Sequence, residues 1–245
     1  MPQRDGSSKY TEEEPLTPAS PAQNIAFSVV IPIINEEQNI HLFYEKVSTQ
    51  LNKLGQAFEV IFVDDGSSDQ TFAELRKLYD KYKGVIRVIR FRRHFGTTPA
   101  LVAGFNRSHG KVIVTMNGDL QDDPEELPRF LSKLEDGYDV VSGWHFPRSG
   151  PFFKELLLKV FTALARRITG VQLHDIDAGF RAYSREVIED RQFKLYGELH
   201  HFAPIIAHWC GFRVTEIKVR HRLCQLSGSK SGTKRFAQDL LGLLN

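Results

Sequence analysis

The chain has 245 residues, of which 41% are hydrophobic and 25% are charged, and its net charge is +2. These proportions are typical of globular proteins and exclude a wholly disordered or collagen-like chain. Two cysteines cannot form a disulfide framework, and no secretory leader is recognisable, so we expect reduced thiols in a cytoplasmic protein. No apolar run approaches the roughly 20 residues of a membrane-spanning helix.

The two ends of the chain differ in composition. Residues 1–24 hold four of the eleven prolines and an acidic run at 12–14, with too little apolar surface to offset the entropy of ordering. We therefore predict a disordered leader over 1–24. Residues 212–235 carry seven basic side chains against Glu216 alone. This stretch is either a solvated surface or a surface for a partner rich in phosphate.

From residue 27 onward, short β-branched runs alternate with longer amphipathic ones. The predicted buried strands are 27–33, 58–63, 85–91, 111–116 and 138–142. The predicted helices are 36–54, 70–82, 98–109 and 124–135, with Asp69 placed to cap the second and Pro124 in the first turn of the fourth. Regular alternation of this kind predicts an α/β fold, with a mainly parallel central sheet and helices on both faces.

The pattern changes after residue 143. Residues 152–169 and 198–209 predict two more helices, and 212–221 alternates apolar and polar residues as a strand does. We predict one domain over residues 25–232. Residues 233–245 predict the start of an amphipathic helix that lies beside a membrane.

Polar clusters follow three of the predicted strands. They contain Pro32, Asn35 and Glu36, then Asp64 and Asp65, then Asn117, Gly118, Asp119 and Gln121. Ligands of open parallel sheets bind beyond the carboxyl ends of the strands, so these clusters should converge at one edge. Carboxylates so close together repel each other unless a cation or a network of donors lies among them.

Two common nucleotide-binding motifs are absent. The sequence has no G-x-G-x-x-G after the first strand and no G-x-x-x-x-G-K-[ST]. An acidic site can still hold a diphosphate when a divalent metal bridges protein and phosphate oxygens. That chemistry suits a nucleotide-sugar donor.

The order of VVIPIINEEQNI, VDDGSSD, FGTTPALVAGFN and GDLQDDPEELP resembles that of the family 2 glycosyltransferases with the GT-A fold. LHDIDAGFRAYSREVI and GSKSGTKRF are similar to motifs of the polyprenyl-phosphate branch, which includes dolichyl-phosphate mannose synthases and undecaprenyl-phosphate sugar transferases. The resemblance runs from residue 27 to residue 245. It implies that residues 25–232 are a GT-A catalytic domain.

The resemblance also implies roles for the matching residues. The nucleotide-sugar contacts would be Pro32, Asn35, Glu36, Asp64, Asp65, Asn117, Gly118 and Arg181. Mg²⁺ or Mn²⁺ would be held by Asp119 and Gln121, and the catalytic residues would be Asp119, Asp175 and Asp177. The acceptor phosphate would be bound by Arg148, Arg222 and Lys230.

The implied activity is transfer of mannose, glucose or a modified sugar from a UDP- or GDP-linked donor to dolichyl or undecaprenyl phosphate. A lipid phosphate is already anionic at neutral pH and needs little help from a general base. Catalysis would then depend on in-line positioning and on metal stabilisation of the leaving diphosphate. We expect a single displacement that inverts the anomeric configuration.

Two alternatives stay open. A GT-A transferase acting on a saccharide or protein hydroxyl would need a true base, and Asp175 or Asp177 would have to serve. A non-catalytic relative that binds nucleotide sugar is favoured by Asn117, which stands where relatives usually have the first acid of Asp-x-Asp. Donor binding without transfer would identify that alternative.

Further expectations concern partners and other metals. Relatives of this type often continue into transmembrane helices, and this sequence ends where such a segment would begin. We expect a membrane surface as partner, at the cytoplasmic face, and no nucleic acid, and we allow for a homo-oligomer. His200, His201 and His208 lie on one predicted helix. Zinc is not expected there, because the pattern offers neither a cysteine nor a third suitable ligand.

Overall fold

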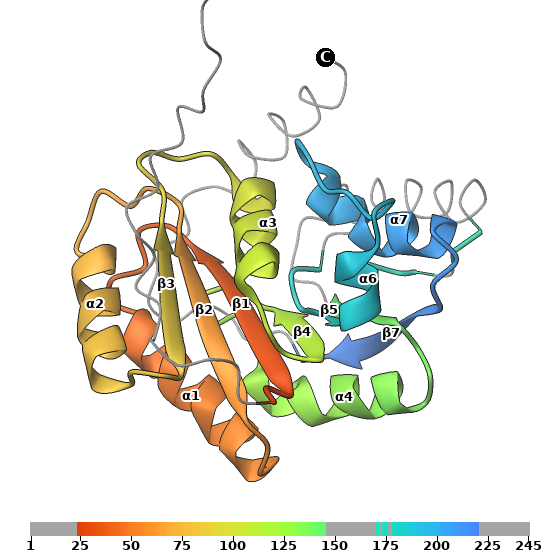
Figure 1. Ribbon diagram of the computed structural model, residues 1–245, viewed down its shortest axis with the longest axis horizontal. Coiled ribbons are helices and arrows are strands. Elements are labelled where there is room, and N and C mark those ends of the chain that lie inside the picture. Colours follow the sequence, from red (N-terminus) through yellow and green to blue (C-terminus); the bar gives the residue numbers. More distant parts are fainter. Residues whose placement is uncertain (1–23, 146–169, 172, 176–177, 221–245) are drawn as a thin grey trace, which may run out of the picture.

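The computed structural model describes residues 24–145, 170–171, 173–175 and 178–220 (Figure 1). They build a seven-stranded sheet in the order β3-β2-β1-β4-β6-β5-β7. The strands are β1 (Phe27–Ile33), β2 (Phe58–Asp64), β3 (Ile86–Arg90), β4 (Val112–Thr115), β5 (Val140–His145), β6 (Arg181–Ser184) and β7 (Val214–Val219).

Helices connect most of these strands. The α-helices are α1 (Ile40–Lys53), α2 (Thr71–Lys81), α3 (Thr97–Arg107), α4 (Leu127–Glu135), α6 (Arg185–Glu189) and α7 (Ala203–Trp209). Two 3₁₀ turns, η1 (Pro124–Glu126) and η2 (Leu199–Phe202), precede α4 and α7. The N-cap residue of α2 is Gln70 and not Asp69, although Asp69 accepts a hydrogen bond from the Thr71 N–H at 2.9 Å. Within the described residues, no helix has the length and apolar character needed to cross a membrane.

The predicted α/β fold with a mainly parallel sheet is confirmed. β1 pairs in parallel with β2 and β4, and β5 pairs in parallel with β7. β6 runs antiparallel to its neighbours β4 and β5. The carboxyl ends of β1, β2, β3, β4, β5 and β7 therefore share one edge of the sheet, and the chain enters β6 at that same edge.

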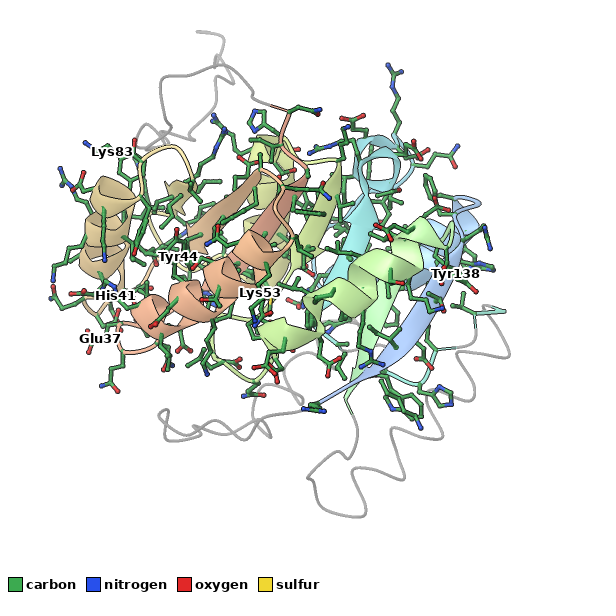
Figure 2. All side chains as sticks on the ribbon, turned by 90° about the horizontal axis from the view of Figure 1, so that it is seen from below. Glu37, His41, Tyr44, Lys53, Lys83 and Tyr138 are labelled. Carbon is green, nitrogen blue, oxygen red and sulfur yellow. The ribbon has the colours of Figure 1, made fainter. Side chains whose placement is uncertain are left out.

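The two faces of the sheet bury separate apolar cores, as the alternation along β1 requires. Val29, Ile31 and Ile33 lie in the core that α1, α2 and α4 cover. Val30 lies in the core that α3, α6 and α7 cover. Figure 2 shows α1 and α4 on the same side of the sheet, with Tyr44 on α1. The helices thus fix the sheet from both sides and leave its carboxyl edge for the loops.

Some element predictions differ from the structure. The helix predicted over 198–209 is divided into η2 and α7, because Pro204 in the first turn of α7 lacks the N–H that a continuous helix needs. The strand predicted over 212–221 is shorter, as β7. β6 and α6 were not predicted, since RAYS is too short to show a period. The helix predicted over 152–169, the leader and the terminal helix lie outside the described residues.

A substitution at Gly104 tests how closely α3 packs on β1. A β-carbon there would overlap Val30 Cγ1 and lie 3.3 Å from Val30 Cβ. Alanine gains about 1 kcal/mol over glycine in a helix interior, but overpacking a core costs about 1–3 kcal/mol. We expect Gly104→Ala to lower the free energy of unfolding in urea by about 1 kcal/mol. The control Asn106→Ala, exposed on the same helix, should be neutral or slightly stabilising, and a stabilised Gly104→Ala would contradict this packing.

Candidate functional site

The loops at the carboxyl edge bring the predicted acidic clusters together. Asn35 and Glu36 follow β1, Asp64 ends β2, and residues 117–121 follow β4. β1 lies between β2 and β4 in the sheet, so the three loops are neighbours. The prediction that the clusters converge is therefore confirmed, and their contacts show how they are held.

Hydrogen bonds join the loop after β1 to the loop after β2. The Asn35 N–H donates to Ser67 Oγ at 3.0 Å, and the Ser68 N–H donates to Asn35 Oδ1 at 2.9 Å. The Glu36 N–H donates to Thr71 Oγ1 at 2.8 Å. Asn35 has a φ of 54°, a left-handed conformation that asparagine tolerates better than most residues. These hydrogen bonds join the two loops to each other and to the start of α2.

Asp64 and Asp65 organise the backbone around them. Asp64 is fully buried, and its Oδ1 accepts the Ser67 N–H at 2.9 Å. Asp65 accepts the Phe95 and Gly96 N–H groups at 2.7 and 2.9 Å and pairs with His94 Nδ1 at 2.7 Å. The loop after β3 is thus fastened to the end of β2. The predicted contacts of both aspartates with the nucleotide stay predictions.

Gly66 makes this fastening feasible. Its φ is 74°, and a β-carbon there would lie 2.6 Å from His94 N and overlap the Arg93 backbone. A side chain at residue 66 would therefore push the Asp65 loop away from the loop after β3.

The loop after β4 carries the predicted metal ligands. Asp122 Oδ2 accepts the Asn117 N–H at 2.9 Å, and Asp119 Oδ1 accepts the Gln121 N–H at 3.1 Å. Leu120 between them has a φ of 63°, which is rare for a large side chain and is strained, and it packs against the apolar core. The partly buried leucine anchors the turn that contains Asp119 and Gln121.

Two glycines let this loop pack closely. Gly118 lies against Ile33, whose Cγ2 a β-carbon would overlap. A β-carbon on Gly179 would lie 2.6 Å from Asn117 Oδ1. The side chain of Asn117 is therefore packed on Gly179, which precedes β6. The predicted contact of Asn117 with the nucleotide sugar stays a prediction.

Negative charge accumulates around Asp119. The pKa of Asp119 is raised to about 6, mainly by burial and also by the nearby carboxylates of Asp122 and Glu36, while the hydrogen bond from the Gln121 N–H opposes the shift. Burial also raises the pKa of Glu36, and Asn39 partly offsets this by donating to Glu36 Oε2 at 2.6 Å. Carboxylate and amide oxygens in such a field match the ligands of a hard divalent cation. The donor set of Asp119 and Gln121 thus fits Mg²⁺ or Mn²⁺.

The segment before β6 is anchored by groups that sequence reasoning missed. The His174 N–H donates to Glu216 Oε2 at 2.6 Å, and its ring also pairs with that carboxylate. The imidazole stacks on Trp144 with ring centroids 4.1 Å apart, and Lys218 Nζ lies 4.6 Å from the Trp144 ring centroid. These contacts hold His174, next to the buried Asp175, against β5 and β7. Glu216 stood out only as the one acid in a basic stretch.

The remaining predicted residues have separate positions. Arg181 is buried at the start of β6, where its guanidinium donates to the carbonyl of His200 and, at 3.1 Å, to that of His201. Pro32 lies in β1, paired with Val63 of β2. The side chains outside the described residues are those of Arg148, Asp177, Arg222 and Lys230.

Comparisons with known proteins give a matching family model and similar named proteins. The family model described as glycosyl transferase family 2 matches residues 28–192. A dodecaprenyl-phosphate galacturonate synthase of Rhizobium johnstonii is 35% identical over 229 residues, which are 92% of this chain and 67% of that protein. An undecaprenyl-phosphate 4-deoxy-4-formamido-L-arabinose transferase of Yersinia enterocolitica is 34% identical over 89% of this chain and 66% of its own. The chain thus spans about two thirds of the length of these relatives.

Solved structures agree on the fold. A glucosyl-3-phosphoglycerate synthase from Mycobacterium tuberculosis, solved with Mn²⁺ and UDP-glucose, has a TM-score of 0.66 and 20% identity over 90% of this chain and 78% of that one. The same synthase with phosphoglyceric acid has a TM-score of 0.67 and 20% identity, covering 90% and 79% of the two chains. The GT-A fold expected from the sequence is confirmed. With the family model matching most of the domain around the acidic loops, the chain belongs to glycosyl transferase family 2.

Proposed function

We propose that this chain transfers a sugar from a nucleotide-diphosphate donor to a polyprenyl phosphate. The observation that carries the proposal is the partly buried carboxylate of Asp119, held beside Glu36 and Asp122 where the loops after β1 and β4 meet. Relatives at about 35% identity are named as polyprenyl-phosphate sugar transferases, which supports the choice of acceptor. The sugar is left open, and the base can be that of a UDP- or a GDP-linked donor.

The proposed activity includes a divalent metal, Mg²⁺ or Mn²⁺, held by Asp119 and Gln121. Their oxygens suit either ion, and a solved structure of the same fold holds Mn²⁺ with UDP-glucose. When bound, the metal supplies positive charge that stabilises the departing diphosphate. In the segment Asn117-Gly118-Asp119 the first side chain is an amide, which packs on Gly179. We therefore assign the carboxylate of Asp119 to the metal.

The protein groups would contribute mainly position. Hydrogen bonds already order the loops around Asn35 and Asp65, so that their polar groups would need little further ordering when the nucleotide binds. Asp175 is held by its neighbour His174, through Glu216 and Trp144, and we assign it to the region of the reacting sugar. The finer roles of Asp177 and Arg181 stay proposals of the same kind.

The proposed chemical step is a single displacement. An oxygen of the acceptor phosphate forms a bond to the anomeric carbon, and the bond from that carbon to the diphosphate oxygen breaks. The bonding electrons leave with the nucleoside diphosphate, so no proton must be removed from the acceptor. Attack opposite the leaving group inverts the anomeric configuration.

The proposed place of reaction is the cytoplasmic face of a membrane. A polyprenyl chain stays in the bilayer, so the protein must approach the surface to reach the phosphate. The basic excess over 212–235 provides charge complementary to anionic lipid.

A transfer assay tests the acceptor, the metal ligand and the membrane together. The chain is mixed with nucleotide sugar, Mn²⁺ and polyprenyl phosphate in anionic vesicles, which are then sedimented. We expect a β-linked lipid product from an α-linked donor and protein in the vesicle pellet. Asp119→Asn should lower kcat/KM by about 10²–10³, as loss of one electrostatic stabiliser does.

Asp136→Asn is the control for this assay, because that carboxylate is exposed at the end of α4 and pairs with Lys133. It should keep wild-type activity. A product with retained configuration would contradict the single displacement. Full activity of Asp119→Asn would contradict the metal assignment, and donor binding without any transfer would favour the non-catalytic alternative.

The pKa of Asp119 predicts how metal binding depends on pH. A protonated carboxyl cannot ligate a metal, so Mn²⁺ affinity should be level above a pH of about 6 and fall below it. One competing proton gives a limit of about tenfold per pH unit. The free Mn²⁺ signal in electron paramagnetic resonance measures this at pH values on both sides of the pKa. An unchanged Kd across that range, or tight binding by Asp119→Asn, would contradict the prediction.

A further inference from the structure

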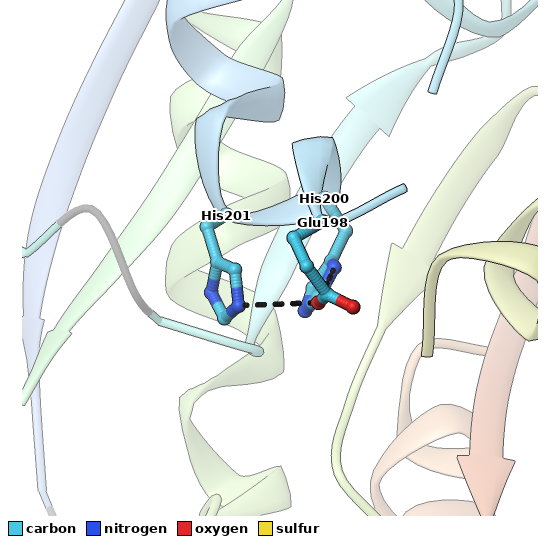
Figure 3. A group of neighbouring side chains, drawn as sticks. All are labelled: Glu198, His200 and His201. Atoms are coloured by element: carbon cyan, nitrogen blue, oxygen red, sulfur yellow. Dashed lines mark ion pairs between the residues drawn. The ribbon is translucent and has the colours of Figure 1, made fainter. Parts of the chain in front are cut away.

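Three side chains gather on the turn that leads into α7. Glu198, His200 and His201 each offer one ligand atom, and these atoms lie within 4.8 Å of one another (Figure 3). Glu198 Oε2 is 3.7 Å from His200 Nδ1 and 3.8 Å from His201 Nε2. The two imidazole centroids are 3.8 Å apart. Two imidazoles and a carboxylate thus converge on one small volume.

The spacing is close to that of a tetrahedral metal centre. Zinc–nitrogen bonds of about 2.0–2.1 Å place neighbouring ligand atoms roughly 3.3 Å apart. The two distances from Glu198 Oε2 exceed this by about 0.5 Å, which small side-chain rotations can remove. Thr98 Oγ1 lies 2.7 Å from His200 Nδ1, so a metal ion bound at that nitrogen would take the place of this hydrogen bond.

Hydrogen bonds and packing hold the backbone of η2 in place. Arg181 donates to the carbonyls of both His200 and His201, and η2 packs against α3 beside Thr98. A ligand set carried by such a turn loses little conformational entropy on binding. The three side chains are also accessible, with 41% of Glu198, 14% of His200 and 27% of His201 exposed. An ion can therefore enter, and water can complete its coordination.

We propose that Glu198, His200 and His201 form a binding site for a divalent transition metal of the zinc class, distinct from the site at Asp119. Two imidazoles with one carboxylate are a ligand set that zinc takes, whereas Mg²⁺ prefers oxygen. The sequence pattern argued against zinc because it lacked a third ligand, and the fold supplies that ligand in Glu198. The proposal does not depend on the proposed transferase activity.

The site borders the donor loops through α3. Thr98 contacts His200, and Gly96 at the start of the same helix donates to Asp65. A metal at Glu198 would therefore lie near the loops that we propose bind the nucleotide. Its ligands would differ from those of the proposed site at Asp119.

Co²⁺ provides a direct spectroscopic test on the full chain. After chelator treatment, the protein is placed in excess Mg²⁺, which occupies oxygen-rich sites, and titrated with Co²⁺ at neutral pH. Tetrahedral Co²⁺ absorbs visible light far more strongly than octahedral Co²⁺. We expect one equivalent to produce this strong absorption and Zn²⁺ to abolish it by displacement. No thiolate charge-transfer band should appear, because Cys210 is not a ligand.

Matched variants assign the signal to the cluster. His201→Ala should weaken Co²⁺ binding by more than about tenfold, and so should Glu198→Gln, which keeps the shape of the side chain. His208→Ala, exposed on α7, should bind Co²⁺ as the wild type does. Equal melting temperatures of the metal-free variants exclude misfolding as the cause of a loss.

Three results would overturn the proposal. The first is wild-type protein that shows only the weak absorption of octahedral Co²⁺. The second is strong absorption retained by both His201→Ala and Glu198→Gln. The third is loss of the signal in His208→Ala, which would place the ion elsewhere.

Discussion

Negative charge held out of water at the carboxyl edge of the sheet is the constraint on which the other features of the site depend. Asp119 lies close enough to Asp122 and Glu36 for their charges to raise its pKa, in addition to the effect of burial. Such a group is stable in the fold only where backbone donors and neighbouring loops hold it in place. The same charge makes the edge attractive to a divalent cation.

The fold meets this constraint by placing backbone N–H groups against carboxylates. Asp64 and Asp122 accept donors from their own loops, after β2 and β4, and Asp65 accepts donors from the loop after β3. The hydrogen bonds of Asn35 with Ser67 and Ser68 join the loop after β1 to the loop after β2. A parallel sheet makes this feasible, because its strands end at a common edge. Leu120 packs the loop after β4 against the apolar core, and Gly179 lets Asn117 of that loop pack against the segment that precedes β6.

The sequence was sufficient to predict the strands and helices whose apolar residues recur at a regular period. The strand at Phe27–Ile33 is long and β-branched, and its carboxyl end runs into Asn35 and Glu36, so both the element and its place in the site could be predicted. β6 could not, because its four residues show no period and depend on pairing with β4 and β5. Pro204 was included in a continuous helix, although its missing N–H marks the start of α7.

Contacts between distant residues were the other limit of sequence reasoning. Glu216 and His174 are 42 positions apart, and only the pairing of β5 with β7 brings them together beside Trp144. The guanidinium of Arg181 donates to the carbonyls of His200 and His201, contacts that the sequence did not indicate, and its predicted contact with the donor stays a prediction. Glu198 precedes those histidines by two and three residues, but the spacing alone did not indicate that its carboxylate turns toward both rings.

Metal-dependent nucleotide binding is the central claim, and thermal unfolding with UDP, GDP and their sugars, with and without Mn²⁺, tests it most directly. A ligand at a hundred times its Kd stabilises the native state by about 2.7 kcal/mol, which raises the melting temperature of a chain of this size by roughly 5 °C or more. We predict such a shift with one of the two bases, only when the metal is present, and none in Asp119→Asn. An equal shift in the presence of a chelator, or no shift from a chain that melts cooperatively, would contradict the account.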